Sequence, residues 1–189
     1  MLSELMPGEL EALGLLALML LSEARRPARI AADGSIVGLL DQDRSLWDRM
    51  MIAEGHSLVR VCLRRNQPGP FQLQAAIAAV HADAARAENT DWAQIIAMYD
   101  QVMLAWLTPV VALNRAVAVA EVHGPDAGLA AIAALGKALD HYQPFHAARA
   151  DLLARVGSPD APAAYDRAIE ISTNLQQRRF LEARKACLP

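Results

Sequence analysis

Our prediction of the fold rests mainly on residues 90–123, TDWAQIIAMYDQVMLAWLTPVVALNRAVAVAEVH. In its first half the apolar residues recur at the spacing that places them on one stripe of a helix. Its second half, residues 109–123, is apolar almost all round, with Asn114 and Arg115 in the middle. A helix of that kind packs on several sides, so we expect two helices joined at Thr108-Pro109, the second of them central.

The composition favours an all-α protein. Of the 189 residues 54% are hydrophobic and only 5% aromatic, which favours helix contacts through small side chains over a β-sandwich. The 18 basic and 21 acidic residues give a net charge of -3, so we expect no direct binding to nucleic acid. Cys62 and Cys187 form no CxxC pair, which fits a reducing cytoplasm. The apolar run at 13–21 is too short to span a membrane and predicts a buried helix.

Proline and capping residues mark the ends of the other predicted helices. The segment RIAADGSIVGLLDQD at 29–43 loses the helical period, and its Asp33-Gly34 pair favours a tight turn, so we expect a short hairpin or extended strap there. The expected helices cover 9–23, a segment from the cap cluster at 41–45 to 65, 70–85, 90–106, 109–123, two segments that begin near 125 and 143, and 174–188.

The later helices repeat at an offset of 34 residues. The matched segments are Arg115-Ala116 with Arg149-Ala150, and Pro125-Asp126-Ala127 with Pro159-Asp160-Ala161. Each copy also has two alanines seven residues apart on one helix face, where another helix can approach closely: Ala127 and Ala134, and Ala161 and Ala168. This period and pattern resemble a tetratricopeptide repeat (TPR).

We therefore expect one domain over residues 1–189, built of stacked antiparallel helix pairs. Residues 1–66 would form N-terminal helices with the strap, 67–174 the helix-pair repeats, and 175–189 a polar-backed capping helix.

The first group of candidate site residues lies where the strap meets the next helix: Asp41, Asp43, Arg44 and Trp47. One interpretation is structural, with helix caps and an Arg–carboxylate clamp that ties the strap to the helices. The alternative is a contact surface for another domain, because Trp and Arg are favoured interface residues.

The second group is Tyr99, Asn114 and Arg115. Asn114 and Arg115 form either a buried network between helices or a polar pocket on the concave face of the stack. The pocket interpretation makes the chain a small-molecule sensor.

No catalytic, cofactor or metal motif is recognisable in the sequence. His56 lies two residues from Glu54, unlike the HExxH spacing, and His141 and His146 straddle Pro144. There is no GxSxG elbow and no phosphate-binding glycine loop. We expect no bound cofactor or metal, and an unrecognised hydrolase or isomerase is the least favoured alternative.

Five motifs together resemble the C-terminal extension of one group of bacterial extracytoplasmic-function (ECF) RNA polymerase sigma factors, of the sigma-70 family, which carry a TPR-like helical domain. They are DQDRSLWDR at 41–49, IAEG at 52–55, GPFQLQAAIAAVHADA at 69–84, TDWAQIIAMYD at 90–100 and PVVALNRAVAVAEVHGP at 109–125.

This resemblance implies a regulatory role in transcription initiation. The partners it implies are the sigma-factor core regions of the same polypeptide, RNA polymerase or another protein, in the cytoplasm, with no membrane contact. The promoter-recognising sigma regions 2 and 4 are absent from this chain, and the resemblance transfers no catalytic residue. Both a natural stand-alone protein and a piece of a longer one remain open.

Overall fold

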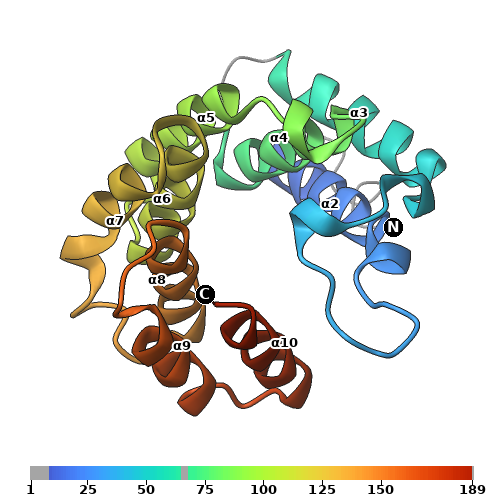
Figure 1. Ribbon diagram of the computed structural model, residues 1–189. Coiled ribbons are helices and arrows are strands. Elements are labelled where there is room, and N and C mark those ends of the chain that lie inside the picture. Colours follow the sequence, from blue (N-terminus) through green and yellow to red (C-terminus); the bar gives the residue numbers. More distant parts are fainter. Residues whose placement is uncertain (1–8, 65–67, 189) are drawn as a thin grey trace. The chain divides into compact units, whose positions relative to one another are not determined.

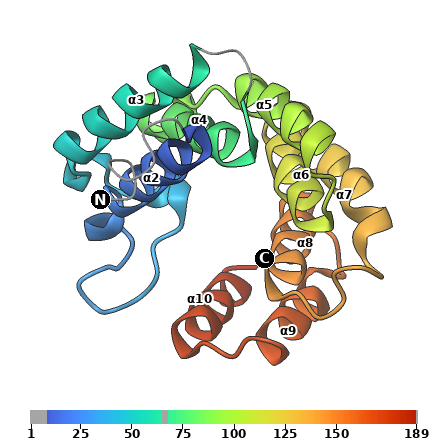
Figure 2. The same ribbon diagram turned by 180° about the vertical axis from the view of Figure 1, so that it is seen from behind.

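The structure, a computed structural model, describes residues 9–64 and 68–188, and this part of the chain is helical without a β-strand (Figure 1). Its helices pack in adjacent pairs, as the same view from behind also shows (Figure 2). The predicted all-α fold of helix pairs is therefore confirmed. The described residues divide into two compact units: unit 1 holds 9–31, 37–64 and 68–107, and unit 2 holds 32–36 and 108–188. One domain over 1–189, in the three parts given above, stays a prediction.

Unit 1 has a core of small side chains. Its α-helices are α2 (Leu10–Glu23), α3 (Arg49–Leu63), α4 (Pro70–Asp83) and α5 (Trp92–Ala105), with short 3-10 helices η1 (Arg26–Ala28), η2 (Leu39–Asp41), η3 (Arg44–Leu46) and η4 (Ala87–Asn89). α2 packs against α3 and α4, and α4 packs against α5. Ala17, Ala75 and Ala76 are buried in this core with Trp47. Alanines let the helix backbones approach closely, as the composition predicts.

α2 is buried on one face only, which corrects the prediction of a buried helix. Gly14, Ala17 and Leu21 are buried, but the side chain of Met19 is 60% exposed. Among the described residues of unit 1, α3 and α4 pack against α2, and the side chain of Met19 is not covered by these contacts.

The strap between α2 and α3 begins with the predicted tight turn. The backbone N–H of Val37 donates to the carbonyl of Arg29 at 2.8 Å, and the N–H of Ser35 donates to the carboxylate of Asp33 at 2.9 Å. Gly34 has φ +82°, a conformation that glycine adopts without steric cost. After the turn the chain enters η2 rather than an extended strand.

Unit 2 is a succession of paired helices: α6 (Pro109–His123), α7 (Pro125–Ile132), η5 (Ala133–Leu135), α8 (Gln143–Arg155), α9 (Ala161–Glu170) and α10 (Leu175–Ala186). α6 packs on α7, α7 on α8, α8 on α9 and α9 on α10. The hydroxyl of Thr108 accepts from the N–H of Val111 at 3.2 Å, and the Asn174 side chain accepts from the N–H of Gln176 at 2.8 Å. These caps explain why α6 and α10 begin where the sequence predicts.

The 34-residue repeat agrees with the helix pairs, but the predicted contact face of Ala127 and Ala134 in the first copy is wrong. In α9, Ala161 and Ala168 are buried, at 2% and 0% exposure. Ala134 is exposed instead, because α7 ends at Ile132. The close approach in this pair is made by Gly128, where an added Cβ would lie 2.6 Å from the Cβ of Ala120.

Candidate functional site

The carboxylates at the end of the strap are caps or surface groups. Asp43 precedes η3 and accepts from the N–H of Ser45 at 2.9 Å. Hydrogen bonds from Ser45 hold the pKa of the Asp43 carboxyl below its ordinary value. Asp48 caps α3 by accepting from the N–H groups of Met50 and Met51. Asp41 is exposed at the end of η2. This arrangement agrees with the capping interpretation.

Arg44 clamps the strap to α4 through backbone carbonyls. It is 6% exposed, and its Nη1 donates to the carbonyl oxygens of His81 and of Ala84, the latter at 2.8 Å. The clamp was predicted, but with a carboxylate as its acceptor. The acceptors are instead carbonyls at the carboxyl end of α4, which have no intrahelical partner and attract a cation.

Trp47 belongs to the core of unit 1. It is 2% exposed, and the guanidinium of Arg44 lies 4.6 Å from its ring centroid. The burial of both side chains favours the structural interpretation, and a contact surface at Arg44 and Trp47 stays a prediction. A buried cation stacked on an indole stabilises the junction of strap and helix.

The surroundings of Arg44 are rich in positive charge. Burial and the neighbouring Arg25 and Arg44 lower the pKa of His81 to about 4. Burial, with repulsion from Arg29 and Arg44, lowers the pKa of Arg25. His81 is thus a neutral imidazole near pH 7, and its ring packs edge-on against Trp92 with the centroids 5.1 Å apart.

The two polar residues of the second candidate group differ in their exposure. The side chain of Asn114 is exposed and that of Arg115 half-buried. Tyr99 is half-buried on α5, and burial raises the pKa of its hydroxyl. None of these residues lines the hollows described below. A pocket built from them stays a prediction.

An apolar hollow of about 470 Å³ lies on the uncovered side of α2; we call it the α2–α3 hollow. Leu16, Met19 and Leu20 of α2 line it, and Met51 of α3 faces them. Ser22, Glu23 and Arg29 complete its lining. The spacing of three and four residues along α2 was visible in the sequence, but which side of that helix stays uncovered was not.

A smaller hollow of about 420 Å³ lies beside the Arg44 clamp. Its lining mixes cations and carboxylates: Arg44, Arg49 and Arg86 with Asp43 and Glu88. Arg86 and Glu88 lie 3.8 Å apart, so part of this charge is already compensated within the hollow.

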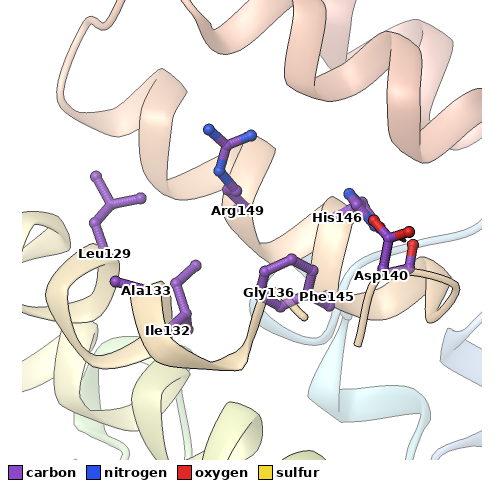
Figure 3. Close-up of a pocket in the computed structure, with 8 residues that line it drawn as sticks. All are labelled: Leu129, Ile132, Ala133, Gly136, Asp140, Phe145, His146 and Arg149. Carbon is purple, nitrogen blue, oxygen red and sulfur yellow. Dashed lines mark hydrogen bonds between the residues drawn. The ribbon is translucent and has the colours of Figure 1, made fainter. Parts of the chain in front are cut away.

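A third hollow, of about 360 Å³, lies between α7 and α8; we call it the α7–α8 hollow (Figure 3). Leu129, Ile132 and Phe145 form its apolar part. Its polar part comprises Asp140, His146 and Arg149. The sequence singled out His146 only as a residue near a helix boundary and Arg149 only as a repeat match. Neither signal could place them on one cavity, because the cavity depends on how α7 packs on α8.

The described residues contain no group of three or more His, Cys, Asp or Glu side chains placed to hold a metal ion. In the same part of the chain, no helix has both the length and the apolar character needed to cross a bilayer.

Two comparisons with known proteins found similar sequences. Residues 1–63 match a family of unknown function, DUF6596. Over 182 residues the chain is 44% identical to an uncharacterized protein, R00370, of Rhizobium meliloti (strain 1021), covering 96% of this chain and 43% of that protein. The chain thus spans less than half the length of this relative. No solved structure is significantly similar to the chain.

Proposed function

We propose that this chain is a regulatory, protein-binding helical domain of an ECF sigma factor. It would control transcription initiation by contacting the sigma-factor core regions of the same polypeptide in the cytoplasm, without itself binding DNA, using a cofactor or catalysing a reaction. The sequence motifs at 41–125 support the family, and the paired helices agree with the TPR-like fold that the resemblance implies. The Rhizobium relative has more than half of its length outside the matched part, which leaves room for such core regions.

The α2–α3 hollow is the observation that carries this proposal. Four apolar side chains, those of Leu16, Met19, Leu20 and Met51, make up most of its lining, and Met19 is 60% exposed. Uncovered apolar surface favours burial against a partner. Methionine side chains are flexible and polarizable, so they adapt to apolar side chains of another protein segment. Glu23 and Arg29 also line the hollow, but Glu23 pairs with Arg26 at 2.9 Å and Arg29 donates to the carbonyl of Ser22, so the apolar side chains supply the main contact.

The direct test is a pull-down of this chain with separately expressed sigma regions 2 and 4 from the same gene. We expect binding, and we expect promoter activity in cells to change when the segment encoding this chain is deleted. Absence of binding together with unchanged promoter activity would contradict the proposal.

A matched pair of variants then tests the surface. Met19→Glu places a charge in the hollow and should weaken the pull-down by about tenfold or more. Leu175→Glu, on α10, is the control, since Leu175 is 61% exposed and Met19 is 60% exposed. Equal loss of binding in both variants would show that the α2–α3 hollow is not the contact site. Circular dichroism checks that both variants fold.

A further inference from the structure

The α7–α8 hollow contains a guanidinium, that of Arg149, with no carboxylate partner among the described residues. Three other arginines of unit 2 form ion pairs at 2.6–2.7 Å: Arg155 with Glu121, Arg184 with Asp151, and Arg167 with Glu170. Among the residues the structure describes, no acidic side chain lies within ion-pair distance of Arg149. Its donors are therefore free for an external anion.

The floor of the hollow is apolar and fixed. Ile132 is 2% exposed and Phe145 is 5% exposed, and both belong to the core of unit 2. In Figure 3, Arg149 stands between Leu129 on one side and His146 on the other, with Phe145 and Ile132 below. A ligand held by Arg149 would therefore rest its body on a packed apolar surface.

His146 adds a second polar group whose orientation is set. The residue is 8% exposed, and its Nε2 donates to the backbone carbonyl of Asp140 at 2.7 Å, since a carbonyl oxygen can only accept. In the neutral tautomer that this bond selects, Nδ1 is an acceptor, so the donors for an anion come from Arg149. His146 and Arg149 are three residues apart on α8, so both side chains extend from one helix face.

Asp140 limits how much negative charge the hollow accepts. Its carboxylate lies in the lining, 3.9 Å from the imidazole of His141. A doubly charged phosphate would meet one guanidinium and one carboxylate, whereas a singly charged carboxylate forms a bidentate pair with Arg149 at less repulsion. The small volume, about 360 Å³, is at the lower end of the range for small-molecule sites.

From this geometry we infer that the α7–α8 hollow binds a small monocarboxylate with an apolar body. The carboxylate pairs with Arg149 beside His146, and the body lies on Leu129, Ile132 and Phe145. The site is independent of the α2–α3 hollow, since the two share no residue. Binding of a monocarboxylate there would be a second function, which the proposed protein-binding role does not require.

The test is titration of the whole 189-residue chain with phenylacetate, followed by heteronuclear NMR and calorimetry. Phenylacetamide, which has the same shape without the charge, and phenyl phosphate are the comparison probes. We expect phenylacetate to shift signals of α7 and α8 and to bind about tenfold or more tightly than either comparison probe. Tighter binding of phenyl phosphate, or shifts elsewhere only, would overturn the inference.

Two variants make the test specific. Arg149→Gln should weaken phenylacetate binding about tenfold and leave the melting temperature unchanged, because Arg149 is exposed and forms no ion pair among the described residues. Arg179→Gln, on the exposed side of α10, is the control, and its dissociation constant for phenylacetate should be about the same as that of the original chain, within about twofold. Unchanged binding by Arg149→Gln would overturn the site while leaving the pull-down result of the proposed function unaffected.

Discussion

Arg44, in η3 ahead of α3, donates a hydrogen bond from Nη1 to the backbone carbonyl of His81 in the last turn of α4. The same guanidinium bonds the carbonyl of Ala84 and stacks on Trp47. One side chain thus joins the strap, the core and the end of a helix that begins 26 residues later in the sequence, at Pro70. We expect the stability of unit 1 to depend on it.

Replacement of Arg44 by Met should lower the free energy of unfolding by about 2–3 kcal/mol. The change leaves two helix-end carbonyls without their donor, and hydrogen bonds from charged groups are stronger than neutral ones. Urea denaturation measures the difference. Arg49→Met is the control, because Arg49 is exposed and, among the described residues, its side chain makes one long hydrogen bond, of 3.5 Å to the carbonyl of Arg44. Equal effects of the two substitutions would show that the clamp contributes nothing of its own.

The stability of unit 1 should fall as the pH falls from about 6.5 to about 4. Native His81 has a pKa of about 4, below its ordinary value of 6.5, so in this interval the unfolded chain binds a proton that the native state does not. The lowered pKa of His81 contributes about 3 kcal/mol to the free energy of unfolding above pH 6.5. This contribution is lost as the pH falls to about 4. Urea titrations at several pH values measure the slope.

His81→Gln is the variant that isolates this contribution. Its stability should depend less on pH over the same interval, because glutamine does not titrate. A profile as steep as that of the original chain would assign the pH dependence to another group.

Gly128→Ala should destabilise unit 2 by about 1–2 kcal/mol, despite the higher helix propensity of alanine. The new Cβ would lie 2.6 Å from that of Ala120, and Leu152 atoms at 3.2–3.3 Å close the other side. Thermal unfolding measures the change. The double variant Gly128→Ala with Ala120→Gly should recover part of the loss.

Gly136→Ala provides the matched control for that pair. Its nearest neighbours lie 3.9 Å from an added Cβ, an ordinary contact, so this substitution should be neutral or slightly stabilising. Similar losses at both glycines would argue against the close approach of α6 and α7.

Asp48→Ala should destabilise the chain by about 1 kcal/mol, because Asp48 accepts from two N–H groups in the first turn of α3. Asp41→Ala should change stability by less than about 0.5 kcal/mol, as is usual for an exposed surface group. Comparison of the two unfolding midpoints separates the capping carboxylate of Asp48 from the exposed carboxylate of Asp41. A larger loss of stability in Asp41→Ala than in Asp48→Ala would contradict this assignment.

Helix positions were predictable from the sequence because their determinants are local. Thr108-Pro109, Asp91 and Asn174 cap or open helices whose starts lie within a residue or two of the predicted ones. The turn at Asp33-Gly34 was predictable for the same reason, since an Asp side chain bonds the backbone two residues ahead. Helical periodicity and capping depend on residues that are close in the sequence, so they do not depend on how the helices pack.

Only the tertiary structure decided which of these residues meet. Arg44 and the end of α4 lie 37–40 residues apart, and no local rule indicates that its acceptors are carbonyls rather than a carboxylate. Likewise, the repeat predicted that Ala127 and Ala134 line a contact, whereas the early end of α7 transfers that role to Gly128. The sequence by itself determined the helices and their caps, since these depend on neighbouring residues. Packing decided the clamp, the uncovered side of α2 and the cavity beside Arg149, because each depends on residues that meet only after the helices pack.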